Sequence, residues 1–145
     1  MNNAILQNLA ALSEDINEVS DNLSQQIADF ETALNKLRLG VTAWVRMYTI
    51  SSSTPLLFDR HFEIGYGKHN AKWGLLFAEG SDLPLKHRQI QPLREAPRAD
   101  RHKAVEKLPE LVKKLEEESR KVVEDARVKN AQMREILGAL RALTQ

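Results

Sequence analysis

The first forty residues carry apolar side chains at the spacing of an amphipathic helix. From Ile5 to Leu23 the apolar positions follow in steps of 4, 3, 4, 3 and 4, which is typical of a coiled-coil seam. The pattern then shifts by four residues and continues from Ile27 to Leu37, a stutter that relaxes supercoiling without ending a helix. Gly40 supplies a stop, because glycine adopts left-handed backbone conformations freely. We predict a helix over residues 3–38.

A similar rhythm returns in the last third of the chain. Apolar residues recur from Leu108 to Leu140 in steps of three and four, with polar interruptions at Ser119 and at Lys129 or Asn130. Pro109 is tolerated best in the first turn of a helix, so the residues before it should form a kinked first segment. We predict a kinked helix over residues 101–143.

The centre of the chain has the composition of strands. The segment from Val41 to Ile50 is rich in β-branched and aromatic residues, and Phe62 to Tyr66 alternates apolar with polar or small residues. A turn at His69-Asn70 then leads into a third apolar run that ends at Ala78. We predict a three-stranded antiparallel β-meander over residues 41–79, with one face covered by a helix or a partner.

Residues 80–100 show no clear periodicity and contain Pro84, Pro92 and Pro97, so we predict a Pro/Arg-rich loop there. Asp100 is a candidate N-cap for the helix that follows. The predicted fold class is therefore α+β, a single domain over residues 1–145. Two long antiparallel amphipathic helices, similar to those of a coiled coil, flank the small three-stranded antiparallel β-meander.

Charge favours the antiparallel arrangement of the two helices. Residues 3–38 carry six acidic and two basic side chains, a net charge of −4, whereas residues 101–145 carry eleven basic and eight acidic ones, a net charge of +3. Laid antiparallel, Asp15 falls near Arg134 and Asp21 near Arg127. Each exposed pair contributes less than about 1 kcal/mol, so such pairs select an orientation. We favour pairing within one chain, and pairing between chains is the alternative.

The sequence offers little chemistry. There is no cysteine, so disulfides, thiolate zinc sites and thiol nucleophiles are excluded. The run Gly65-Tyr66-Gly67-Lys68 lacks the spacing of a phosphate-binding P-loop, and the four histidines share no metal-ligand spacing. We therefore predict no catalytic residue, no metal and no cofactor, and hence no enzyme.

The chain also lacks the sequence features of a secreted or membrane protein. Its N-terminus has no cationic region followed by an apolar one, and no stretch of about 18 uncharged apolar residues occurs. We predict a cytoplasmic protein that does not enter the membrane.

Basic and aromatic residues in the central region form the best candidate binding site. Basic side chains near exposed aromatic rings can bind a protein partner, single-stranded nucleic acid or a small phosphorylated ligand. The candidate residues are Tyr66, Lys68, His69, Lys72, Trp73, Lys86, Arg88, Arg94 and Arg98.

The order helix, β segment, helix, with long helices of heptad spacing, resembles the layout of a prefoldin subunit. In that family a coiled-coil hairpin extends from an oligomerising β platform and holds unfolded clients, so the resemblance implies a chaperone. Aromatic-rich strands and the Pro/Arg-rich segment over residues 80–100 depart from that layout.

We interpret the chain first as a non-enzymatic interaction module, an adaptor, scaffold or regulatory subunit, that presents its β head with a basic loop to a protein partner. Binding of nucleic acid or a phosphorylated ligand is the alternative, and a prefoldin-like chaperone is a lesser one. Two helices alone cannot enclose their apolar seams, so we expect a homodimer. The predicted interface residues are Ile16, Leu23, Ile27, Phe30, Leu34, Val122 and Met133.

Overall fold

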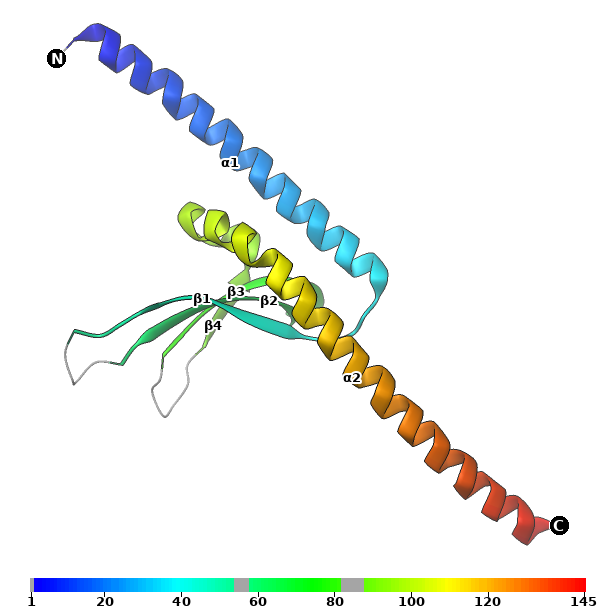
Figure 1. Cartoon of the computed structure of the whole chain (residues 1–145). Helices are drawn as coiled ribbons and strands as arrows, with labels where there is room; N and C mark the ends of the chain where they lie inside the picture. Colours follow the sequence, from blue (N-terminus) through cyan, green and yellow to red (C-terminus); the bar gives the residue numbers. More distant parts are fainter. Residues whose placement is uncertain (1, 54–57, 82–87) are drawn as a thin grey trace.

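The computed structural model describes residues 2–53, 58–81 and 88–145 (Figure 1). The fold is α+β, with two long helices and a four-stranded antiparallel sheet of order β1-β2-β3-β4. The elements in chain order are α1 (Asn3–Leu37), β1 (Ala43–Ile50), β2 (Arg60–His69), β3 (Lys72–Ser81), β4 (Gln89–Pro92), the short 3₁₀ helix η1 (Leu93–Glu95) and α2 (Arg98–Thr144).

The first helix has the extent that its apolar spacing predicts, and only the stop residue differs. Asn2 caps its start by accepting a hydrogen bond from the Ala4 amide. At its end Arg38 takes the left-handed conformation, with a φ of 50°, and its amide donates to the Asn35 carbonyl. Gly40 also has a positive φ, of 66°, but lies beyond the helix cap. The chain therefore reverses through two left-handed residues before β1.

The sheet has four strands where the sequence predicts three. The additional strand, β4, falls in the segment predicted to be a loop, and its residues from Gln89 to Pro92 pair with β3 from Glu79 to Leu76. Gln alternates with Ile and Pro in this strand, but four residues that end in a proline are too short a run to stand out as a strand in the sequence. Proline is tolerated there because β4 is an edge strand.

A bulge in β1 aims one aromatic side chain at α2. The register between β1 and β2 shifts between Arg46 and Tyr48, which turns Tyr48 onto the ring of Phe62, with 4.5 Å between centroids. The Tyr48 hydroxyl donates a 2.6 Å hydrogen bond to a carboxylate oxygen of Asp100. Asp100 thus lies within the first turn of α2 and anchors β1, whereas the predicted N-cap role belongs to Pro97.

The two tyrosines should titrate well above their ordinary range. Burial, followed by the hydrogen bond to Asp100 and its charge, raises the pKa of Tyr48 to about 12. Burial and the charge of Glu31 also raise the pKa of Tyr66. The folded state therefore holds these protons more tightly than the unfolded chain, so stability is undiminished below about pH 10 and falls as the pH rises from there through about 12.

Spectrophotometric titration of phenolate absorbance checks this expectation. The native protein should show its phenolate midpoint above pH 10, and the midpoint should return to about 10 in denaturant. The Tyr48→Phe variant, which leaves Tyr66 as the one remaining tyrosine, should keep a raised midpoint. Half of the native phenolate signal appearing at pH 10 would refute the buried environment of these rings.

Both helices pack on one face of the sheet and share one core (Figure 1). Alternate residues of β2 and β3 point to this face, and α2 crosses β1 while α1 lies along β3. The least exposed side chains of this core are Ile64, Tyr66, Leu75, Leu93, Ala104, Leu111 and Leu115.

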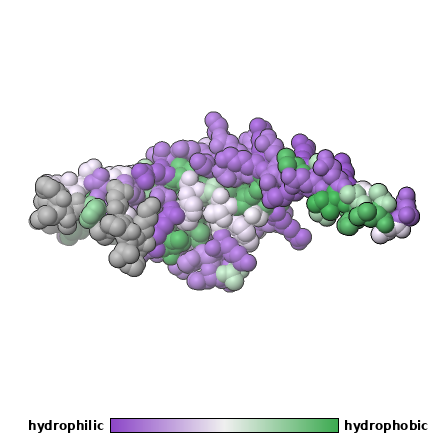
Figure 2. All heavy atoms as spheres, turned by 90° about the horizontal axis from the view of Figure 1, so that it is seen from below, coloured by the Kyte–Doolittle hydropathy of each residue, from purple (hydrophilic) through white to green (hydrophobic). Residues whose placement is uncertain are grey.

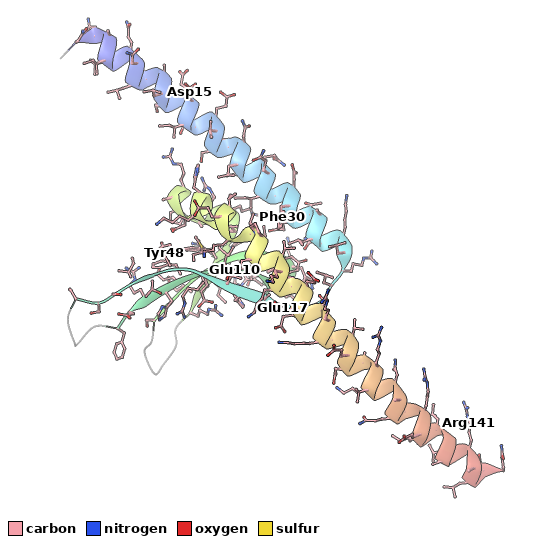
Figure 3. The ribbon with its side chains drawn as sticks, viewed as in Figure 1. Asp15, Phe30, Tyr48, Glu110, Glu117 and Arg141 are labelled. Atoms are coloured by element: carbon pink, nitrogen blue, oxygen red, sulfur yellow. The ribbon has the colours of Figure 1, made fainter. Side chains whose placement is uncertain are left out.

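The antiparallel helical pairing predicted within one chain is wrong. Ser20 of α1 accepts a hydrogen bond from Arg101 of α2, and Leu34 lies across a groove from Leu115, so the two helices run in the same direction. Figure 3 shows Asp15 and Arg141 at opposite ends of the molecule. The ion pairs of α2 are internal, as between Lys129 and Asp125. The hairpin implied by the resemblance to prefoldin is therefore not formed by the described residues.

The reason for the shared direction lies in the segment between β4 and α2. β4 stops opposite Leu76, and η1 with Pro97 then carries the chain to Tyr48, near the far end of β1. From there α2 crosses β1 and runs toward Leu39, which follows the C-terminal end of α1. Pro109 lies inside α2, and the helix bends in its first turns before running straight (Figure 1).

Candidate interaction surfaces

Each helix extends well beyond the head that the sheet and its core form. We call residues 3–19 the α1 arm and residues 120–144 the α2 arm; at about 1.5 Å per residue they are about 25 and 37 Å long. The two arms leave the head in opposite directions (Figure 1). Large apolar side chains remain about half exposed along both of them. They are Ile5, Leu6, Leu9, Leu12, Ile16 and Val19 in the first arm, and Val122, Val123, Val128, Met133, Ile136, Leu137, Leu140 and Leu143 in the second.

These side chains form a stripe along the α1 arm and a cluster near the end of the α2 arm. In the α1 arm they repeat the seam spacing of a coiled coil, and in the α2 arm they gather toward the C-terminal end, where Figure 2 shows an apolar patch at the right. Of the predicted interface residues, Ile16, Val122 and Met133 are 51–54% exposed on the arms. The remainder lie in or against the core of the head, namely Leu23, Ile27, Phe30 and Leu34.

Two side chains of α1 attach it to the free edge of β3. Because β4 stops at Pro92, the backbone of β3 before Leu76 has no strand beside it on that edge. The Leu75 amide donates a 2.9 Å hydrogen bond to a carboxylate oxygen of Glu31. The Asn35 side-chain amide donates to the Trp73 carbonyl at 3.2 Å, and its oxygen accepts from the Tyr66 hydroxyl at 2.5 Å. α1 thus satisfies the strand edge that β4 leaves open.

Replacing Glu31 by alanine should destabilise the head by about 2 kcal/mol, because the buried Leu75 amide would lose a charged acceptor. Glu31→Gln, which keeps an acceptor oxygen, should cost less. The matched control is Asp29→Ala on the same helix, an exposed carboxylate that contacts Gln25 of its own helix, and it should change stability by less than about 0.5 kcal/mol. Denaturant unfolding measures all three, and equal losses for Glu31→Ala and Asp29→Ala would refute the anchoring role.

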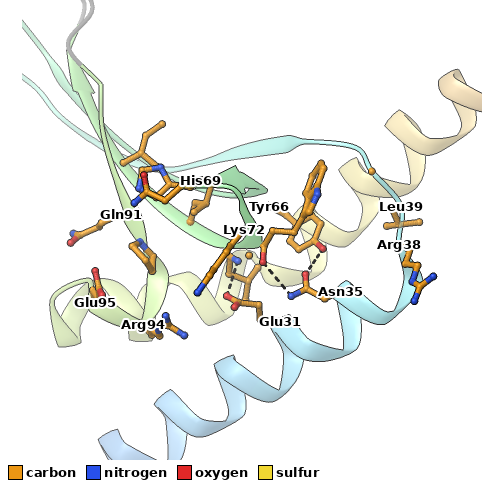
Figure 4. Close-up of a pocket in the computed structure, with 18 residues that line it drawn as sticks. Glu31, Asn35, Arg38, Leu39, Tyr66, His69, Lys72, Gln91, Arg94 and Glu95 are labelled. Atoms are coloured by element: carbon orange, nitrogen blue, oxygen red, sulfur yellow. Dashed lines mark hydrogen bonds between the residues drawn. The ribbon is translucent and has the colours of Figure 1, made fainter.

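A cavity of about 1050 Å³ lies beside this attachment, between α1, β3 and η1 (Figure 4). Lys72 and Arg94 extend into the space between η1 and α1, and neither forms an ion pair with any residue that the structure describes. The walls also contain Glu31 and Glu95, so the cavity is of mixed charge. Five of the nine predicted binding residues line it: Tyr66, His69, Lys72, Trp73 and Arg94.

The other predicted binding residues lie elsewhere. Arg88 stacks on the ring of Trp44, 4.1 Å from its centroid, and pairs with Glu63 on the sheet face opposite the helices. Lys68 is exposed at the end of β2, and Arg98 is exposed in the first turn of α2. Lys86 lies outside the described residues. The predicted basic site is therefore divided between two faces of the head.

Sequence reasoning missed Glu31 and Asn35, which both line the cavity and attach α1 to β3. One signal was available. These two residues are four apart, on the stripe of α1 next to Ile27 and Leu34, so polar groups fall beside an otherwise apolar helix face. Polar groups at the margin of such a face commonly find a partner in the structure.

A metal centre is not present among the described residues. They contain no group of three or more His, Asp or Glu side chains placed to bind a metal ion. Within the same ranges, neither helix has an apolar stretch of the length needed to cross a bilayer. No protein-family model, curated protein or solved structure matches the chain.

Proposed function

We propose that this chain is a non-enzymatic protein-interaction module of the cytoplasm, an adaptor or scaffold that self-associates through its helical arms and presents the β head. One observation carries the proposal: both helices continue far beyond the core, with apolar side chains that no other described residue covers. Contiguous exposed apolar surface on a soluble domain marks an interaction site.

Association would also support the helical conformation of the arms. Most helix stability in proteins comes from tertiary packing of the apolar face. Every residue of the α1 arm is exposed, so the described residues give this arm no such packing. Association would cover the stripe and stabilise the helix at the same time.

The head offers a surface for a further protein partner on the sheet face that the helices leave open. There Trp44 lies between Gly65 below and the Arg88 guanidinium above, and Glu63 pairs with Arg88. Tryptophan and arginine are the residues most often found at the energetic centre of protein interfaces. An assembled module would display this face away from its helices.

Thermal unfolding tests the association. If the arms are stabilised by other copies, the midpoint followed by circular dichroism at 222 nm should rise with protein concentration, as mass action requires. A midpoint that stays constant as the concentration changes over two decades would overturn the proposal.

A second candidate function is binding of single-stranded nucleic acid or a small phosphorylated ligand in the cavity. The unpaired cations Lys72 and Arg94, with Trp73 in the wall, support it. Anisotropy of a labelled oligonucleotide should then fall steeply with rising salt, and Lys72→Ala should reduce the slope, while exposed Lys113→Ala on α2 should not. No retention of the oligonucleotide or of inorganic pyrophosphate at low salt would exclude this function.

A further inference from the structure

We infer that the arms are covered by a second copy of this chain, with each α1 arm packed antiparallel on the α2 arm of the other copy. The inference rests on the proposed self-association and specifies its geometry. Within one chain the two arms point in opposite directions and cannot meet (Figures 1 and 3). A twofold rotation brings the α1 arm of each copy beside the α2 arm of the other, in the opposite direction.

The spacing of the two apolar stripes supports this pairing. Read forward from Ile5, α1 has seam steps of 4, 3, 4, 3, 4 and 4; read backward from Thr144, α2 has the same steps in the same order, through Asn130. The stutter of α1 therefore faces the stutter of α2, and antiparallel helices stay in register across it. On the exposed arms the facing pairs are Ile5 with Thr144, Leu9 with Leu140, Leu12 with Leu137, Ile16 with Met133 and Val19 with Asn130.

The charges of the arms select the same partners. Residues 3–23 contain four acidic side chains, Glu14, Asp15, Glu18 and Asp21, and no lysine or arginine. Residues 120–145 contain six basic and three acidic side chains. Pairing α1 with a second α1 would set acid against acid, and pairing α2 with a second α2 would set cation against cation. Like charges along a seam disfavour a partner, so each arm selects the other kind.

The offset of the helices within one chain locates the twofold axis. Ser20 lies beside Arg101 and Leu34 across from Leu115, which fixes how far α2 is displaced along α1. The same register, extended along both helices, sets residue 34 of one copy level with residue 115 of the other, while both leucines stay in the core of their own heads. Both relations hold together only at this level, so the axis crosses the helices there.

An apolar groove occupies that position in the structure. It has a volume of about 670 Å³ and lies between the end of α1 and the middle of α2, with Leu34, Leu37, Val112, Leu115 and Val123 in its walls. Leu37 is 64% exposed at its rim. A groove with a protruding leucine on a twofold axis is self-complementary, because each copy can offer Leu37 to the groove of the other.

Cysteine cross-linking tests the arrangement, and the chain has no cysteine of its own to interfere. Leu12→Cys and Leu137→Cys replace exposed arm residues far from the core. When the two single variants are mixed and oxidised, they should form a covalent species of twice the 16.5 kDa chain mass, and neither variant should do so alone. The control pair Glu14→Cys and Glu135→Cys lies at the same level on the outward faces and should yield no such species.

The outcomes separate this inference from the proposed self-association. A covalent dimer of Leu12→Cys alone would show that α1 pairs with α1, which overturns the exchanged arrangement and leaves self-association standing. The absence of any cross-link, with light scattering giving twice the chain mass, would likewise overturn only the exchange. The absence of any cross-link with a monomeric mass would overturn both and assign the arms to a different partner.

Discussion

Gly65→Ala should destabilise the protein by about 3 kcal/mol, the upper range for overpacking of a rigid site. A Cβ at this position would lie 2.4 Å from the Trp44 ring and 2.8 Å from the Ala43 carbonyl oxygen. The carbonyl belongs to the paired backbone of β1 and cannot move aside, and the indole is held from above by Arg88. The clash can therefore be relieved only by separating β1 from β2, which would also disturb the packing around Tyr48.

Denaturant unfolding followed by tryptophan fluorescence measures this loss. Gly138→Ala is the matched control, because a Cβ there meets no atom within 4 Å and the residue lies inside a helix. That substitution should be neutral or stabilising by about 0.5–1 kcal/mol, since alanine loses less backbone entropy than glycine in a helix. Equal effects of the two substitutions would contradict the close packing of Trp44 on Gly65.

Leu12→Asp should weaken self-association by at least about 100-fold, while the head remains folded. The substitution removes an apolar seam side chain and places a charge where the second copy would exclude water. It also adds a negative charge to an arm that is already acidic. Because residue 12 lies outside the core, the near-ultraviolet circular dichroism of the head should not change.

Asn17→Asp is the control for the charge itself. It adds the same single negative charge to the same arm, one residue beyond Ile16 and off the apolar stripe. Sedimentation velocity over a concentration series should place it close to the unchanged protein. If both variants dissociate equally, the effect is one of net charge and the seam is not buried.

Much of the fold could be predicted from local pattern. The extents of both helices follow from apolar spacing, and the first three strands follow from β-branched and aromatic runs between turn residues. β4 could not be predicted, because its alternating pattern is only four residues long and ends in a proline, and the strand is placed by the edge of β3.

Local pattern could not predict the relative direction of the two helices. Matched seams and opposite charges indicate that α1 and α2 suit one another antiparallel, but they do not say whether the two belong to one chain. Within one chain, the backbone runs from β4 through η1 to the first turn of α2, where Asp100 binds Tyr48. This route sets the two helices parallel. The cavity was also only partly predicted. Tyr66, Lys72 and Trp73 lie on the two strands beside the turn that the sequence indicates, whereas Arg94 reaches the cavity from η1.

The molar mass in solution tests self-association most directly. Size-exclusion chromatography with light scattering at micromolar concentration should give twice the 16.5 kDa mass of the chain. Its elution should be early for that mass, because the paired arms make a long particle. A mass of 16.5 kDa at every concentration, with the arms still helical by circular dichroism, would contradict association of the arms with a second copy.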